Sequence, residues 1–177
     1  MTRVGHDLHV HSTWSDGKAH PVENLIAAAN AEVSRDNPGN LFVSAFAAIL
    51  DLDSGELRYC NAGHDNPYRL HPSYSAPLRV DDGDGPPLCA LADFDYRGAR
   101  CSLLPGEMLC LMTDGVTEAQ TAAGALYGNE RLQELLQRLQ REAVGAKTLV
   151  EALRDDVLAF AAGAEPADDL TILALRW

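Results

Sequence analysis

The chain has 177 residues, of which 46% are hydrophobic, a length and composition that suit one ordinary domain with a sizeable core. Its 26 acidic residues outnumber 14 basic ones, and the net charge of −12 argues against a protein that binds nucleic acid through a basic face. No secretory signal is visible, and no apolar run reaches the roughly 20 residues that span a bilayer. We therefore expect a soluble, cytoplasmic protein with no nucleic-acid or membrane partner.

The cysteines exclude the common zinc and redox motifs. The chain has four of them, at positions 60, 89, 101 and 110, and no two form a C-x-x-C pair. We expect free thiols, as in a reducing compartment. Cys110 lies within an apolar run and is expected to be a buried small hydrophobe.

The first predicted element is a helix that begins at Pro21 and runs to about Ser34, because its apolar residues recur at helical spacing. An Asn-Pro-Gly segment then breaks the helix. Residues 41–51 and 56–61 are rich in strand formers, and the tight Asp-Ser-Gly turn at 53–55 separates them. This pattern predicts a β-hairpin.

The rest of the sequence predicts more strands and two amphipathic helices. The strands are expected at 66–71, 96–103, 108–113 and 170–175, and the helices at 130–139 and 147–161. Residues 108–113 are almost wholly apolar, as in a strand covered on both faces. Residues 72–87, rich in Pro, Gly and Asp, are expected to form a surface loop. The order helix, strands, helices, strand indicates an α+β fold in which mainly antiparallel sheets are covered by helices.

Carboxylates flank two of these strands. Asp114 follows the apolar run and precedes Gly115, whereas Asp168 and Asp169 precede the last strand. Carboxylates gathered from separate strand ends suit Mg²⁺ or Mn²⁺, which prefer oxygen ligands. A water on such an ion is acidified and can attack phosphorus. The alternative is an ordinary Asp-Gly turn and an ordinary cap between helix and strand, and spacing alone leaves both open.

Seven short blocks resemble the SpoIIE/RsbU branch of the PPM (phosphatase 2C-like) family. They include Asn-Ala-Gly-His, Leu-Pro-Gly-Glu, Thr-Asp-Gly-Val-Thr-Glu-Ala and Ala-Asp-Asp-Leu-Thr, and they follow the order in which the family has them. Each block alone is weak, but the set is specific. The blocks lie at residues 37–46, 50–57, 59–64, 104–107, 113–119, 127–128 and 167–171.

The resemblance implies a PPM-like layered β-sandwich flanked by helices over residues 21–177. It also implies a metal-dependent protein serine/threonine phosphatase of bacterial signalling, with two Mn²⁺ or Mg²⁺ ions. Its metal ligands and catalytic residues map to Asp114 and Asp168. The family's usual substrates are phosphorylated proteins such as anti-sigma-factor antagonists. Asn61 and His64 either contact the substrate phosphate, with His64 assisting protonation, or shape a turn beside the site.

The family's domain starts with blocks that are not found here. These are Gly-Gly-Asp on a strand, then Asp-x-x-Gly-x-Gly, then a long helix, and they supply the carboxylate that bridges the two ions. We expect the first strands and one long helix to be lacking, so that an inactive, PPM-like binding module is the alternative to an enzyme. Apolar surface left uncovered by missing strands could drive formation of a homodimer.

Residues 7–17 resemble a different family. The run Asp-Leu-His-Val-His-Ser-Thr-Trp-Ser-Asp-Gly looks like the opening motif of the PHP (polymerase and histidinol phosphatase) family, so we expect residues 1–20 to be a segment separate from the rest. The resemblance implies His9 and His11 as metal ligands, with Asp16 near the site. Asp7 or Asp16 could replace the missing bridging carboxylate. A solvated strand end is the other interpretation, and a PHP-type phosphoesterase is the second alternative function.

Overall fold

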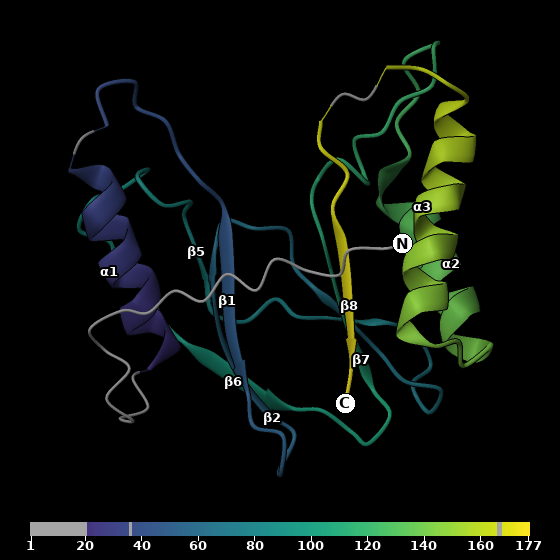
Figure 1. Cartoon of the computed structure of the whole chain (residues 1–177), viewed down its shortest axis with the longest axis horizontal. Helices are drawn as coiled ribbons and strands as arrows, with labels where there is room; N and C mark the ends of the chain where they lie inside the picture. Colours follow the sequence, from purple (N-terminus) through teal and green to yellow (C-terminus); the bar gives the residue numbers. More distant parts are fainter. Residues whose placement is uncertain (1–20, 36, 166–167) are drawn as a thin grey trace, which may run out of the picture.

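The computed structural model describes residues 21–35, 37–165 and 168–177. Within these ranges, two β-sheets pack face to face and helices cover both outer faces, which gives four layers (Figure 1). This arrangement confirms the predicted α+β fold. The helices are α1 (Val22–Ser34), α2 (Gly128–Arg141) and α3 (Ala146–Ala161).

The first sheet forms around the predicted hairpin. Its strands are β1 (Ala45–Leu50), β2 (Glu56–Ala62), β5 (Asp84–Gly85) and β6 (Ala99–Ser102). β1 pairs antiparallel with β2, and β2 also pairs with β5 and β6. Asp51 closes the hairpin turn, because its Oδ1 accepts hydrogen bonds from the backbone N–H groups of Asp53 (3.0 Å) and Ser54 (2.9 Å). Such aspartate turns are a standard way to reverse a chain.

The second sheet has the order β4-β3-β7-β8 and is antiparallel throughout. Its strands are β3 (Tyr68–Leu70), β4 (Leu78–Arg79), β7 (Met108–Met112) and β8 (Ile172–Arg176). Side chains of β7 alternate between the helices and the first sheet, and both directions are apolar. The buried run predicted at 108–113 is therefore confirmed, with Cys110 fully buried.

Three apolar clusters hold the layers together. The largest joins the leucines of α2 and α3 to the outer face of the second sheet. A second cluster joins α1 to the first sheet, and a third lies between the sheets, where Leu57 and Tyr59 of β2 meet Leu109 of β7. Burial also raises the pKa of the Cys110 thiol to about 12 and that of Cys60 to about 11, so both thiols stay protonated near neutral pH.

Two predicted segments differ most from the structure, while the strands predicted at 66–71 and 96–103 are each shorter, at Tyr68–Leu70 and Ala99–Ser102. The strand expected from residue 41 begins only at Ala45, because Leu41 and Phe42 are exposed and Val43 makes an isolated bridge to Leu88. The loop expected at 72–87 contains β4 and β5. Strands of two residues are too short to show the alternation that identifies a strand in a sequence.

An ion pair is buried beside the start of β7. The Glu107 side chain is 0% exposed, and its Oε1 accepts a hydrogen bond from Arg69 Nε at 2.6 Å. Its Oε2 accepts from the Tyr74 hydroxyl (2.9 Å) and the Leu104 backbone N–H (2.6 Å). Burial raises the pKa of Tyr74, and the hydrogen bond to Glu107 raises it further. These contacts tie β3 to the turn before β7.

A second polar cluster joins α2 to α3. Asp156 of α3 accepts hydrogen bonds from the Tyr127 hydroxyl (2.8 Å) and Arg131 Nε (3.0 Å). The Arg131 guanidinium also lies over the rings of Tyr127 and Phe160, at 5.3 and 5.0 Å from their centroids. The hydrogen bond from Arg131 holds the pKa of Asp156 below its ordinary value of 3.8.

This lowered pKa predicts how the free energy of unfolding depends on pH. The ionised carboxylate is the form that the fold favours, so its contribution is complete above the ordinary pKa and is lost as the pH falls through the lower pKa of the folded state. We expect the free energy of unfolding of the wild-type chain to be about 1 kcal/mol larger than that of Asp156→Asn near pH 7. This difference in stability should shrink below about pH 4. Urea denaturation of both chains across this range measures it, and a difference that does not change with pH would contradict the assignment.

Candidate functional site

The ends of β7 and β8 are locked together by Thr113. Its backbone N–H donates to the carbonyl of Thr171 (3.1 Å), and its hydroxyl donates to the carbonyl of Asp169 (2.7 Å). The same hydroxyl accepts a hydrogen bond from the Thr171 N–H at 3.0 Å. The residues just beyond these strand ends, Asp114 and Asp168, are therefore brought to one corner of the second sheet.

Gly115 allows the two segments to touch. A Cβ atom placed on it would lie 2.5 Å from the carbonyl oxygen of Asp169 and 3.3 Å from that of Asp168. The turn itself is closed by the carbonyl of Asp114, which accepts from the Glu118 N–H (2.8 Å) and the Thr117 hydroxyl (3.2 Å). The glycine of the Asp-Gly pair is thus required by a close backbone approach.

Gly115→Ala is expected to push the Asp168 segment away from Asp114. We expect the free energy of unfolding to fall by about 1–3 kcal/mol, because the added methyl group meets backbone atoms that have no room to move. Gly145→Ala is the comparison, since nothing lies within 4 Å of a Cβ there and its φ is −79°; because Gly145 is the N-cap of α3, we expect only a cap cost below about 1 kcal/mol. Equal urea midpoints for the two variants would contradict the close contact.

The carboxylates of Asp114, Asp168 and Asp169 belong to exposed residues. Asp168 Oδ1 accepts a hydrogen bond from the Asp169 N–H at 2.7 Å. Within the described ranges, none of the three forms an ion pair with a lysine or arginine. Oxygen donors that no cation neutralises suit a hard divalent ion, which needs only one or two carboxylates and keeps several waters.

The number of donor side chains limits how many ions this corner could hold. Among the residues that the structure describes, no three His, Cys, Asp or Glu side chains are grouped to hold a metal. An ion at this corner would therefore draw at most two described carboxylates and keep most of its waters. They do not by themselves supply the third side chain that a two-ion centre would share.

Asn61 is a buried structural residue of β2, only 2% exposed. Its side-chain amide donates to the His64 carbonyl (2.8 Å) and to Asn66 Oδ1 (2.7 Å), and its Oδ1 accepts from the His64 N–H (2.8 Å). Gly63, between them, has a φ of +73°, which favours glycine. These contacts favour the turn-shaping alternative for Asn61.

His64 is half-buried, and its Nδ1 lies 2.7 Å from the Asp65 carbonyl oxygen. That contact leaves the other ring nitrogen, Nε2, as the atom available for chemistry. Asp65 and Asn66, the residues that follow, line a pocket at the end of β7.

This pocket, of about 80 Å³, lies beside the Asp114 turn. Thr117, whose hydroxyl bonds to the Asp114 carbonyl, lines it together with Met112 of β7 and Asn129 of α2. Arg79 of β4 is the cation in its wall. The sequence predicts a loop at Arg79, and no motif marks that position. Thr117, by contrast, belongs to a block that was recognised.

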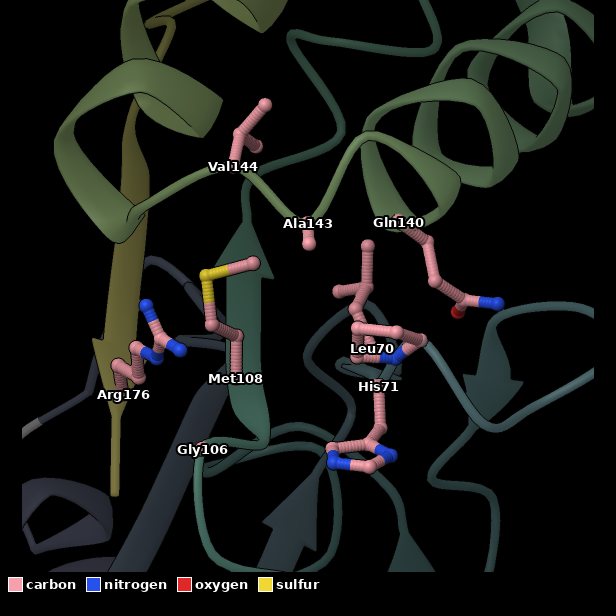
Figure 2. Close-up of a pocket in the computed structure, with 9 residues that line it drawn as sticks. Leu70, His71, Gly106, Met108, Gln140, Ala143, Val144 and Arg176 are labelled. Atoms are coloured by element: carbon pink, nitrogen blue, oxygen red, sulfur yellow. The ribbon is translucent and has the colours of Figure 1, made fainter.

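Another pocket lies at the opposite end of β7. Figure 2 shows it between the end of β3, the start of β7 and the loop after α2, with Met108, Gln140 and Arg176 in its wall. Its volume of about 20 Å³ has room for one water molecule. The Gln140 Oε1 atom is buried and has no hydrogen-bond partner among the described residues. This pocket is too small, and too far along the strand, to serve the Asp114 corner.

The histidine motif falls outside the described part of the chain. His9, His11, Asp7 and Asp16 all lie in residues 1–20, so their predicted roles as ligands remain predictions. In the part that is described, no helix has the length and apolar character needed to cross a membrane.

Comparison with known sequences identifies relatives. The model of the family "Stage II sporulation protein E (SpoIIE)" matches residues 10–177. Protein IcfG of Synechocystis sp. is 29% identical over 136 residues, which cover 76% of this chain and 20% of IcfG. Phosphoserine phosphatase RsbU of Bacillus subtilis is 27% identical over 157 residues, which cover 89% of this chain and 45% of RsbU. The chain thus spans less than half the length of either relative.

Solved structures share the fold. The RsbU and RsbW domains of Rv1364c from Mycobacterium tuberculosis match with a TM-score of 0.66 at 23% identity, over 89% of this chain and 43% of that one. The SiaA-PP2C domain of Pseudomonas aeruginosa matches with a TM-score of 0.63 at 19% identity, over 88% of this chain and 69% of that one. The phosphatase domain of SpoIIE from Bacillus subtilis matches with a TM-score of 0.58 at 13% identity, over 92% of this chain and 76% of that one. These solved structures therefore share the architecture of this chain.

Proposed function

The chain belongs to the SpoIIE family, and from this membership we propose that it is a metal-dependent phosphatase acting on phosphoserine or phosphothreonine in a protein of bacterial signalling. The observation that carries the proposal is the corner formed by Asp114 and Asp168, where Gly115 lets the two backbones touch. The relative named phosphoserine phosphatase supports the substrate class. We extend the proposal to a cytoplasmic location and to a phosphorylated anti-sigma-factor antagonist as the substrate.

Asp114 and Asp168 would hold Mn²⁺ or Mg²⁺, which supplies an acidified water and neutralises charge that develops on the phosphoryl oxygens. The protein's part is to fix the two carboxylates. Thr113 does so through its three hydrogen bonds across the strand ends, and Gly115 does so by leaving room for Asp169. Arg79 offers a guanidinium to an anionic group that enters the neighbouring pocket.

One observation favours a second candidate, a PPM-like domain that binds a signalling partner without catalysis. Among the described residues, no three His, Cys, Asp or Glu side chains are grouped to hold a metal, so a third ligand beside Asp114 and Asp168 is not found there. Two-ion chemistry depends on both ions being held, so loss of a shared ligand usually abolishes it. Binding of one hydrated ion at the corner would survive such a loss.

Two measurements on the full chain separate the candidates. Isothermal titration with Mn²⁺ reports whether the corner binds an ion, and phosphate release from p-nitrophenyl phosphate and from a phosphoserine peptide reports catalysis. Ion binding with Mn²⁺-dependent turnover supports the phosphatase. Ion binding without turnover supports the binding module, and absence of both overturns the metal assignment.

A further inference from the structure

The pocket beside the Asp114 turn lies on the side of β7 that faces away from β8. It is lined by the loop before β3, by β3 and β4, by the end of β7 with the turn that follows, and by the first turn of α2. The sheet order β4-β3-β7-β8 puts all of these strands on one side of β8. Its volume of about 80 Å³ can hold several waters, and therefore also a carboxylate group. We call it the Arg79 pocket.

The register of the second sheet fixes where Arg79 lies. Arg79 is directly opposite Tyr68 of β3, and Tyr68 is directly opposite Cys110 of β7. Residues that are opposite one another lie on the same face of a sheet. Tyr68 and Cys110 belong to the apolar cluster beneath α2 and α3, so Arg79 lies on the face that the helices cover. It is nonetheless an exposed residue, because β4 is at the end of the sheet order.

The charge of Arg79 is available to a ligand. Within the described ranges, no carboxylate lies within ion-pair distance of its guanidinium, not even that of Asp65, which lines the same pocket. A guanidinium presents a rigid fork of N–H donors that matches the two oxygens of a carboxylate. Asn129, in the first turn of α2, also lines the pocket, and no side chain caps that helix. The helix end adds to the positive potential that Arg79 supplies.

One peptide can reach both the Arg79 pocket and the Asp114 corner. Thr117 lines the pocket, and its hydroxyl donates to the Asp114 carbonyl at 3.2 Å. Two strand spacings separate Arg79 from Cys110, about 10 Å, and four residues of extended chain separate Cys110 from Asp114, about 13 Å. The Cα atoms of Arg79 and Asp114 are then about 16 Å apart, and their side chains shorten that gap. An extended peptide advances about 3.3 Å per residue, so two or three residues span the remainder.

The wall of the pocket favours a group with one negative charge. Asp65 contributes a carboxylate to the wall that repels anions, and it opposes a doubly charged group more than a singly charged one. A phosphate monoester carries about 1.5 to 2 negative charges at pH 7, whereas an aspartate or glutamate side chain carries one. A carboxylate is therefore the better ligand for Arg79.

We propose that the Arg79 pocket is a specificity subsite that takes an aspartate or glutamate side chain two or three residues from the phosphoserine of the substrate. The proposal rests on the proposed function for the position of the phosphoserine at the Asp114 corner. The pocket itself consists of described residues. Because the chain as a whole carries a net charge of −12 and repels an acidic peptide, a local cation decides which acidic peptides bind well.

A series of phosphoserine peptides tests the subsite. Each peptide is otherwise neutral and has one aspartate within three residues of the phosphoserine, and a matched peptide has asparagine at that position. We expect kcat/KM at low salt to be about fivefold higher for aspartate than for asparagine at one or two positions, as for an exposed ion pair. Arg79→Gln should bring this ratio close to one. Arg141→Gln, which removes the same charge at the far end of α2, should keep it.

The ratio also separates the subsite from a direct contact with the phosphoryl group. If Arg79 held that group, Arg79→Gln would lower kcat/KM for both peptides by the same factor and leave the ratio unchanged, which overturns the proposal. A ratio of one at every position in the wild-type chain overturns it as well. Asp65→Asn should raise the ratio, because it removes the repelling charge from the wall, and a lower ratio would contradict the assignment. Far-ultraviolet circular dichroism checks that each variant is folded.

Fluorescence anisotropy with the same peptides, labelled and in the presence of Mn²⁺, keeps this test apart from the test of catalysis. If no peptide is turned over, the proposed phosphatase activity fails, and the ratio of Kd values for the asparagine and aspartate peptides still decides the subsite. We expect that ratio to be about fivefold in the wild-type chain and close to one in Arg79→Gln. Turnover with equal affinities and equal kcat/KM values would leave the phosphatase standing and overturn the subsite.

Discussion

Asp114→Asn is expected to remove manganese-dependent phosphate release almost completely. Changes to groups that merely orient a metal ligand typically cost about 10–100-fold, so loss of a ligand itself should cost more than about 100-fold in kcat/KM. Mn²⁺ affinity should fall with activity, because the amide keeps the size of the side chain but loses its charge. Initial rates with a phosphoserine peptide and Mn²⁺ titration provide the two measurements.

Asp155→Asn is the control for this substitution. Asp155 is also exposed and also loses one negative charge, but it lies on α3, where its Oδ1 bonds to the neighbouring Arg154. It should leave both rate and Mn²⁺ affinity unchanged. Full activity in Asp114→Asn would remove Asp114 from the site, and equal losses in both variants would point to net charge as the cause.

Glu107→Ala should strongly destabilise the fold. It leaves the Arg69 guanidinium, 16% exposed, without its carboxylate, and it strips the Tyr74 hydroxyl and the Leu104 N–H of their acceptor. Breaking a buried ion pair by removing one partner typically costs about 3–5 kcal/mol. Urea denaturation gives the change in the free energy of unfolding.

Two other variants test whether the loss of stability in Glu107→Ala comes from the buried ion pair. Glu32→Ala removes one partner of the exposed pair with Arg35 and should change stability by less than about 1 kcal/mol. The double variant Arg69→Met, Glu107→Leu should recover much of the loss, because replacing both charges with apolar groups avoids an unpaired buried charge. If Glu107→Ala were as mild as Glu32→Ala, the carboxylate would not be holding β3 to the turn before β7.

Much of the fold could be predicted because its main elements have strong local patterns. The apolar run of β7 and the regularly spaced leucines of α2 and α3 can be recognised in the sequence. A buried strand and an amphipathic helix each impose a characteristic pattern of apolar residues. The turn at Asp51 likewise follows from its residue types. By contrast, β4 and β5 have two residues each, and β5 is held by pairing with β2, which no local pattern reveals.

The candidate site could be predicted only in part. Asp114 and Asp168 were identifiable because each adjoins a predicted strand, but their meeting depends on β7 and β8 being neighbours. The ion pair of Arg69 with Glu107 joins residues 38 positions apart, and the position of Arg79 beside the Asp114 turn depends on a two-residue strand. Such contacts are set by the tertiary structure, which the spacing of residues along the chain does not encode.

The hydrogen bond between Thr113 and Thr171 also leads to an expectation about the order of folding. It joins residues 58 positions apart, whereas the β1–β2 hairpin closes between Asp51 and Glu56. Closing the longer loop costs about 2 kcal/mol more in chain entropy, so β8 should dock after the hairpin and after α2 and α3 have formed. Until β8 docks beside β7, Asp168 is not held next to Asp114. Recovery of metal binding during refolding should therefore lag behind recovery of helical structure.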